Sequence, residues 1–169
     1  MPHSHPMYLT LCIRWGWGKK SEEDMESTKK QIPIEEGLFY IPSSPDEKPY
    51  LIGTKCKVCG LAAFPKTLVC PKCMQKDTME EALLIGKGKL DSFSIVQAAL
   101  PGFKAPSIQA YINLEKGPRI WSLVTGCDPS EEALKPGMDM EMVIAKVRED
   151  DQGNEIISYQ FKPAGKVKI

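Results

Sequence analysis

The sequence predicts a mainly β protein, and three features of the 169-residue chain support this. Two pairs of cysteines stand close together, which is typical of a small metal-binding ribbon. Five runs rich in β-branched and aromatic residues follow them. Short turns join most of these runs, and one longer connection follows the third. Together these features predict an N-terminal helix, a rubredoxin-like zinc ribbon and a five-stranded barrel of the OB (oligonucleotide/oligosaccharide-binding) type.

The N-terminal part is expected to contain one short helix. Pro33, followed by Glu35 and Glu36, suits the first turn of a helix over residues 26–40. The preceding apolar run, YLTLCIRWGWG, is too short to span a bilayer. Because Met25 resembles a natural start, we interpret residues 1–24 as an upstream extension of the gene or a disordered tail.

Composition shifts along the chain suggest five segments. A Pro/Ser-rich loop, PSSPDEKP, separates the helix from the cysteine pairs, and a Gly-Lys run leads into the β-rich part. The predicted segments are a tail or upstream extension (1–25), the helix and linker (26–47), a zinc ribbon (48–85), an OB-fold domain (86–163) and a tail (164–169).

The stretch CKVCGLAAFPKTLVCPKC, residues 56–73, holds two Cys-x-x-Cys pairs separated by ten residues. Gly60 after the first pair allows the tight turn in which backbone amides reach thiolate sulfur. Zinc prefers four soft ligands in a tetrahedron, and a shell of four thiolates is closed, hence structural. We therefore expect one structural zinc ion on Cys56, Cys59, Cys70 and Cys73. Iron is the alternative, although the spacer is much shorter than that of a rubredoxin.

The β-rich runs cover residues 88–99, 107–115, 118–127, 138–149 and 155–163. In the fourth run, Met138, Met140 and Met142 alternate with acidic residues, so we expect the methionines to pack in the core rather than bind a cofactor. In the connection after the third run, Asp128 and Pro129 suit the start of a helical turn. Five strands with a helix after the third follow the plan of an OB barrel.

The charge balance argues against generic nucleic-acid binding. Lys and Arg total 22, as do Asp and Glu, so the formal net charge is zero. From Lys48 to Lys89, however, eight lysines face three acidic residues, a surplus of five. Four thiolates with one divalent metal would reduce this surplus to about three. The segment either meets an anionic ligand or presents a solvated lysine face.

No catalytic residue is predicted. The only histidines are His3 and His5, and no Ser-His-acid set, Gly-x-Ser-x-Gly motif or phosphate loop occurs. Cys12 and Cys127 have no neighbouring pattern typical of a nucleophile, so we interpret them as structural or incidental. Paired Cys-x-x-Cys motifs without a secretory signal or membrane span suggest a cytoplasmic protein.

The order of several motifs resembles one family. After the cysteine stretch come GKGKLDSFSIV, LPGFKAPSIQAYINLEKGPRIWSLVTGCDP, LKPGMDMEMVI and YQFKP. These are similar to the acyl-CoA-associated proteins that join a rubredoxin-like zinc ribbon to an OB fold, over about residues 32–163. The ribbon spacing is generic, whereas the PGF-x-AP loop, GPR hairpin, GCDP and PGM turn in this order are specific. Lys89 and Asp91 depart from the pattern by placing charge in the first barrel strand.

The resemblance implies an accessory subunit of a thiolase-type complex. Members of the family pair with thiolase-like enzymes, thiolase-fold aldolases or enoyl-CoA hydratase-like enzymes. The reactive groups would then belong to a thiolase-fold catalytic subunit, and this chain would dock on it and help to bind coenzyme A or acyl-CoA at the subunit interface. We expect a benzoylsuccinyl-CoA thiolase, or next an acetoacetyl-CoA thiolase, in a two-plus-two hetero-oligomer by analogy with dimeric thiolases.

Four further residues are candidates for binding. In the LPGFKAP loop, Lys104 is placed to pair with a phosphate, and Phe103 to pack on adenine or line the pantetheine channel. The alternative for Phe103 is a plug in its own barrel. Phe39 and Phe64 are candidate anchors for the partner subunit, and packing within the chain is the alternative. Trp121, which shares a strand face with Arg119, is expected in the barrel core.

Two other functions compete with the accessory subunit. Zinc ribbons and OB folds both commonly bind RNA or single-stranded DNA, so a single-stranded nucleic-acid-binding module is the first alternative. Zero net charge and few aromatics on the barrel strands count against it. A stand-alone redox protein with iron in the ribbon is the second, and a colourless protein containing zinc would exclude it.

Overall fold

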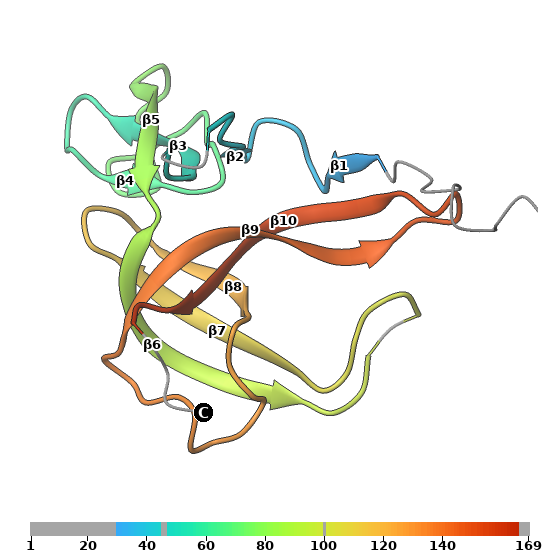
Figure 1. Ribbon diagram of the computed structural model, residues 1–169. Coiled ribbons are helices and arrows are strands. Elements are labelled where there is room, and N and C mark those ends of the chain that lie inside the picture. Colours follow the sequence, from blue (N-terminus) through green and yellow to red (C-terminus); the bar gives the residue numbers. More distant parts are fainter. Residues whose placement is uncertain (1–29, 45–46, 100, 166–169) are drawn as a thin grey trace, which may run out of the picture.

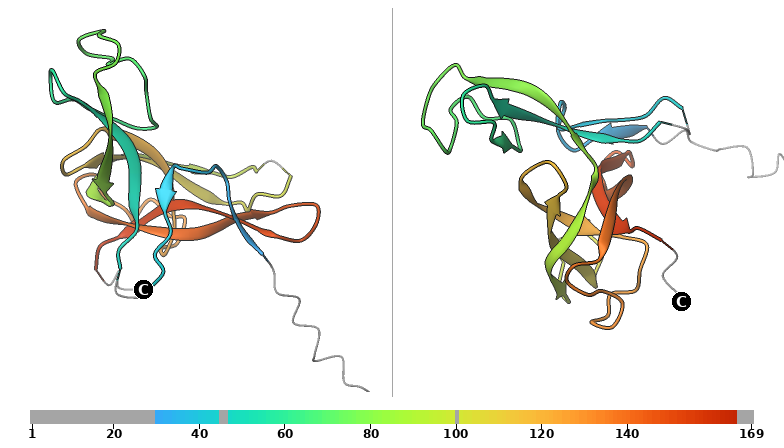
Figure 2. Two further views of the ribbon diagram at one scale, coloured as in Figure 1. Left: turned by 90° about the horizontal axis from the view of Figure 1, so that it is seen from above. Right: turned by 90° about the vertical axis from the view of Figure 1, so that its left-hand side faces the viewer.

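The computed structural model describes residues 30–44, 47–99 and 101–165. Ten β-strands form two sheets, which Figures 1 and 2 show as a small upper unit and a larger lower barrel. The strands are β1 (Gln31–Pro33), β2 (Phe39–Tyr40), β3 (Tyr50–Cys56), β4 (Ala62–Ala63), β5 (Met79–Ile85), β6 (Lys87–Val96), β7 (Ser107–Leu114), β8 (Arg119–Val124), β9 (Asp139–Glu149) and β10 (Glu155–Pro163).

Strands β6 to β10 close a five-stranded barrel. Their order is β6-β7-β8-β10, with β9 pairing both β10 and β6, and β8 runs parallel to β10. This is the connectivity of an OB fold, so the predicted barrel is confirmed. The strands also lie within a few residues of the predicted runs.

Inward-facing side chains fill the barrel in the pattern of alternation. In β7 the even-numbered residues from Ile108 to Leu114 are buried, and in β9 Met140 and Met142 are buried. The predicted core role of the methionines is therefore confirmed. Phe161 of β10, which has no exposed surface, is the largest fully buried side chain.

The N-terminal helix expected over residues 26–40 is not found in the part of this range that the structure describes. Instead, β1 pairs in parallel with β10, and β2 pairs with β3. Between them, Gly37 has φ 77°, a left-handed conformation that ends any helix. Residues 26–29, like the N-terminal segment interpreted as a tail or extension, lie outside the described residues.

The helical turn expected after β8 is also absent from the described chain. Residues 125–138 form successive turns, in which the amide of Ala133 donates to the carbonyl of Ser130 at 3.3 Å. Leu134 in this connection is buried and packs with the barrel core. One apolar side chain thus contributes to the core here without a helix to carry it.

The ribbon is built around β3. This strand pairs with β5 along its whole length on one side and with β2 and β4 on the other. The ribbon ends at Ile85 and the barrel begins at Lys87, so only Gly86 separates the two sheets. A Cβ atom at Gly86 would lie 2.5 Å from Cβ of Met142, so this close crossing requires glycine.

Candidate functional site

The structure brings the four predicted cysteines together. All four Sγ atoms lie within 4.8 Å of one another, with 3.7 Å between Cys56 and Cys73 and 3.4 Å between Cys59 and Cys70. Tetrahedral zinc with bonds of about 2.3 Å places its sulfur ligands about 3.8 Å apart. The cluster therefore fits one tetrahedral ion of this size, as the ribbon spacing predicts.

Two knuckles of the same backbone geometry form the cluster. In the first, the amide of Gly60 donates to the carbonyl of Cys56 at 2.9 Å, and in the second the amide of Met74 donates to that of Cys70 at 2.9 Å. In each knuckle the first cysteine also accepts amide hydrogen bonds on sulfur from the residues two and three positions later, and the second from the residue two positions later. These amides stabilise thiolate charge.

The thiols influence one another strongly. The hydrogen bond between the Cys56 thiol and the Thr78 hydroxyl, 3.5 Å long, lowers the pKa of Cys56 to about 6 together with the backbone amide of Cys59. Although the amide of Gln75 acts in the opposite direction, burial and the neighbouring thiols raise the pKa of Cys73 to about 11. Four such thiols ionise together only where a cation balances their charge, so the set is suited to a divalent metal.

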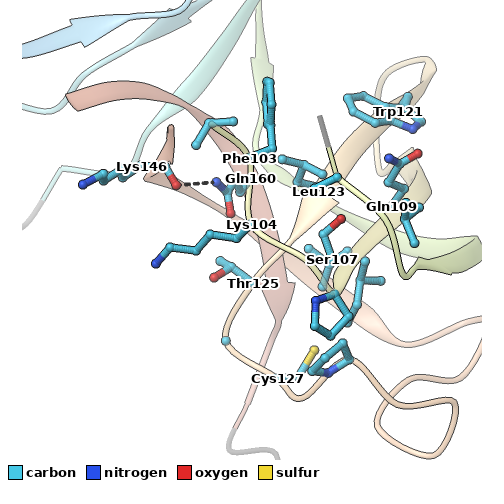
Figure 3. Close-up of a pocket in the computed structure, with 18 of the residues that line it drawn as sticks. Phe103, Lys104, Ser107, Gln109, Trp121, Leu123, Thr125, Cys127, Lys146 and Gln160 are labelled. Atoms are coloured by element: carbon cyan, nitrogen blue, oxygen red, sulfur yellow. Dashed lines mark hydrogen bonds between the residues drawn. The ribbon is translucent and has the colours of Figure 1, made fainter. Parts of the chain in front are cut away.

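A cavity of about 580 Å³ is the second feature of the candidate site. It lies between loop residues 97–99 and 101–106 and the strands β7 to β10, and it is lined by both predicted ligand residues, Phe103 and Lys104 (Figure 3). Its lining mixes apolar side chains with polar ones. The polar and charged members include Ser107, Gln109, Thr125, Lys146 and Gln160.

Phe103 lies on the surface rather than inside the barrel. Its side chain is 40% exposed, and the guanidinium carbon of Arg148 lies 5.9 Å from the ring centroid. The ring therefore lies near Arg148 of β9 on the surface, and the alternative of a barrel plug does not hold. Lys104 lines the cavity beside Phe103, and contact of either side chain with a ligand stays a prediction.

The buried amide of Gln160 is a lining group that the sequence did not reveal. Its Nε2 donates to the carbonyl of Lys146 at 3.2 Å (Figure 3), and the residue lines the cavity. The side chain is almost fully buried, so its orientation is fixed by packing. Gln160 stands in a strand that reads as ordinary core, which is why no sequence signal marked it.

Trp121 was expected in the core, and that expectation is wrong. The side chain is 46% exposed and lines the same cavity. In β8 the residues Ile120, Ser122 and Val124 face inward instead. Arg119 was the missed signal, because a charged side chain on the same face as Trp121 places that face outside the barrel.

The outer face of β7 and β8 carries a connected set of polar and aromatic groups. Arg119 lies 4.4 Å above the ring of Tyr111 and 2.6 Å from the carboxylate of Asp91. Asn113 also donates to Asp91 at 2.9 Å. The charge of Asp91, unusual against the family pattern, is therefore balanced on this face, and Lys89 is likewise paired with Asp139 at 2.9 Å.

Phe39 and Phe64 pack inside the chain. Both rings make edge-to-face contacts with Tyr159 of the barrel, at centroid distances of 6.2 and 5.4 Å. Phe39 is buried and Phe64 partly buried, at the contact between ribbon and barrel. The packing alternative thus describes their observed surroundings, and contact with a partner stays a prediction.

Cys127, the remaining described cysteine, is partly buried at the edge of the cavity. Burial, with the nearby charge of Asp128, raises the pKa of its thiol. A thiol of raised pKa is mostly protonated at neutral pH and is a poor nucleophile. Cys12, His3 and His5 lie outside the described residues.

Family models match both halves of the chain. The model described as the ChsH2 rubredoxin-like zinc ribbon domain matches residues 46–80, and the ChsH2 C-terminal OB-fold domain matches residues 83–145.

Within the described residues, no helix is long and apolar enough to cross a membrane.

Relatives and solved structures agree with the models. A DUF35 domain-containing scaffold protein of Methanocaldococcus jannaschii is 41% identical over 120 residues, which cover 69% of this chain and 84% of that protein. The benzoylsuccinyl-CoA thiolase subunit BbsA of Geobacter metallireducens is 32% identical over 147 residues, covering 85% and 97%. The solved structure of the Ltp2-ChsH2(DUF35) aldolase has a TM-score of 0.55 at 21% identity. The match covers 68% of this chain and 84% of that chain, and it supports the fold.

Replacing one ligand cysteine tests the metal centre. We expect Cys70→Ser to lose most bound zinc and to unfold the ribbon, because zinc binding in small ribbons contributes on the order of 10 kcal/mol to folding. Metal content by mass spectrometry and amide hydrogen exchange over residues 50–85 measure both effects. Cys127→Ser is the matched control, and we expect it to retain normal zinc content because Cys127 is not one of the four clustered cysteines. Normal zinc content and solubility in Cys70→Ser would show that the four-cysteine site is wrong.

The second knuckle carries a removable strain. Met74 has φ 57° where the first knuckle has Gly60 at φ 71°, and its side chain is 73% exposed. We expect Met74→Gly to raise the free energy of unfolding by roughly 0.5–1 kcal/mol, because a left-handed conformation disfavours side chains and little packing is lost. Denaturant unfolding at fixed zinc concentration measures it. Gly60→Ala should act in the opposite direction, and a destabilised Met74→Gly would contradict this account.

Proposed function

The chain belongs to the ChsH2-type (DUF35) family of proteins that join a zinc ribbon to an OB fold, and we propose that it is a non-catalytic accessory subunit of a thiolase-type acyl-CoA enzyme complex. In this role it docks on a thiolase-fold catalytic subunit and helps to bind coenzyme A. The observation that carries the proposal is the similarity to BbsA, named as a thiolase subunit, along 97% of that protein.

The chemistry of the described residues supports an accessory role. The cysteines that cluster are suited to hold a metal with all four positions filled, which leaves none for a substrate. Cys127 is mostly protonated at neutral pH, and both histidines of the sequence precede residue 6. A thiolase reaction needs a reactive thiolate and proton-transferring groups, so the partner supplies them in this proposal.

The cavity supports the proposed part in coenzyme A binding. Coenzyme A combines anionic phosphates, a purine ring and a flexible arm that contains amides. Lys104 offers a cation, Phe103 and Trp121 offer exposed aromatic surface, and Gln160 offers an amide group within the same cavity. We propose Phe103 and Lys104 as the contacts of this chain with the cofactor.

The acyl group and the assembly belong to the same proposal. Benzoylsuccinyl-CoA is the first candidate substrate, because a BbsA relative extends over nearly its whole length, and acetoacetyl-CoA is the second. A two-plus-two hetero-oligomer is the proposed stoichiometry, by analogy with dimeric thiolases. Phe39 and Phe64 are retained as proposed contacts with the partner, and a cytoplasmic location is expected.

One observation favours the alternative of a nucleic-acid-binding module. Tyr111 and Trp121 are register partners on β7 and β8, and each is 46% exposed on the strand face that OB folds commonly use for oligonucleotides. Bases stack on such rings without sequence preference. This function predicts oligonucleotide binding that weakens steeply as salt concentration rises.

Capture of the native partner tests the proposed function directly. The tagged protein is purified from nuclease-treated lysate of its own host, and copurifying proteins are identified by mass spectrometry. We expect a thiolase-fold protein in stoichiometric amount. Recovery of nucleic-acid-processing proteins alone, with salt-sensitive binding of a single-stranded oligonucleotide, would instead support the nucleic-acid module and overturn the accessory role.

Lys104 provides a sharper test within the assembled complex. We expect Lys104→Ala to weaken coenzyme A binding about five- to tenfold, because a hydrogen bond from a cation to phosphate is lost. Assembly, followed by size-exclusion chromatography, should be unchanged. Lys116→Ala, in the turn between β7 and β8, is the matched control. Unchanged affinity in Lys104→Ala would remove this lysine from the site.

A further inference from the structure

A second cavity, of about 310 Å³, lies at the junction of ribbon and barrel. It shares no lining residue with the first cavity. Apolar surface comes from both sheets, since Tyr50 and Ile85 belong to the ribbon and Met142 and Val143 to the barrel. Its volume is at the lower end of the range for small-molecule sites in proteins.

The charges around this junction cavity are unequal. Glu141 of β9 is the register partner of Lys87 in β6 on one side and of Lys162 in β10 on the other. Nζ of Lys162 lies 3.1 Å from the Glu141 carboxylate, and Lys48 adds a third amine to the lining. Three lysines against one carboxylate leave an excess of two positive charges, and no other acidic residue of the described chain lines the cavity.

Two other lysines of the lysine-rich segment have different surroundings. Lys57 and Lys66 form ion pairs with Glu80 and Glu81 of β5 and so belong to a solvated face. Lys48 and Lys87, by contrast, contribute to a concave surface. The interpretation as a solvated lysine face therefore describes Lys57 and Lys66, and the interpretation as an anion-binding segment stays open for Lys48 and Lys87.

The walls of the junction cavity are held in place. The amide of Met142 donates to the carbonyl of Gly86 at 2.7 Å, where no Cβ would fit. Tyr50 stacks on Tyr40 with a centroid distance of 4.6 Å and an angle of 8° between the rings. Glu47, which precedes Lys48 in the chain, has its carboxylate hydrogen-bonded to Tyr40 and does not line the cavity: it accepts a hydrogen bond from the Tyr40 hydroxyl at 3.0 Å.

We propose that the junction cavity binds a small organic phosphate that also carries a planar or apolar group. Lysine is a common point-charge partner of phosphate, so Lys48, Lys87 and Lys162 would contact the anion. Tyr50 and Met142 would contact the rest of the molecule. This site is separate from the cavity of the proposed function and does not depend on a catalytic partner.

ADP is the probe for this site, titrated calorimetrically into the zinc-loaded full chain at low ionic strength. We expect saturable binding that Lys87→Ala weakens about five- to tenfold and that added salt weakens further. Glu141→Gln should tighten binding several-fold, because it frees Lys162 from its ion pair. Lys116→Ala is the control outside the cavity. Zinc content and thermal unfolding verify that each variant is folded.

Three outcomes would overturn the inference. One is the absence of ADP binding to the folded chain at millimolar concentration. Another is loss of ADP binding in Lys104→Ala but not in Lys87→Ala, which would place the anion in the first cavity. The third is equal affinity for ADP and pyrophosphate, which would leave the apolar wall without a role. Partner capture is independent of all three, so failure here leaves the accessory function standing.

Discussion

The convergence of four cysteine sulfurs is the interaction on which the ribbon depends. Between Lys57 and Met79, only Ala63 and Cys70 are buried. In this tip of the ribbon, residues 57–79, the large apolar side chains of Val58, Leu68 and Met74 are exposed, and the others are only partly buried. A segment with so little buried apolar surface does not offset its conformational entropy by packing, so a metal cross-link is the means by which it folds.

The base of the ribbon is stabilised differently. Phe39, Leu51 and Leu84 belong to the same buried cluster as the barrel interior. Tyr159 of β10 meets aromatic rings of the ribbon edge-to-face and donates its hydroxyl proton to the carbonyl of Trp121 at 3.4 Å. The ribbon therefore has a metal-dependent tip on a base that shares the barrel core. Damage to the metal site is expected to loosen the tip more than the junction cavity beside the base.

Much of the fold could be predicted from the sequence because its signals are local. The cysteine spacing and the alternation in β7 and β9 each reflect a constraint acting within a few residues. The N-terminal segment could not be read in this way. Ile32 lies opposite Ile156, a pairing between positions far apart that no local pattern near Pro33 encodes. β5 was missed for a similar reason, since Leu83 and Ile85 are exposed and its pairing with β3 is long-range.

In the candidate site, too, the features with a local sequence signal could be predicted and those that depend on long-range contacts could not. The four cysteines and the position of Phe103 and Lys104 on a loop followed from sequence. The orientation of Trp121 was misread because Ser122 and not an apolar residue faces inward beside it. The junction cavity was out of reach altogether, because Lys48, Lys87 and Lys162 come from a loop and two strands that only the folded chain brings together.

The outer face of β7 and β8 bears on the choice between the two functions. Its exposed rings, Tyr111 and Trp121, suit either stacked bases or a protein partner, so charge decides between them. Arg119 is stacked on Tyr111, but its charge is balanced by Asp91 at 2.6 Å. An oligonucleotide gains most of its affinity from cations that neutralise phosphate, and a balanced guanidinium contributes little of this. Trp, Tyr and Arg are also the residue types that dominate protein–protein binding energy. The composition of this face therefore accords better with docking on a protein than with binding a nucleic-acid strand.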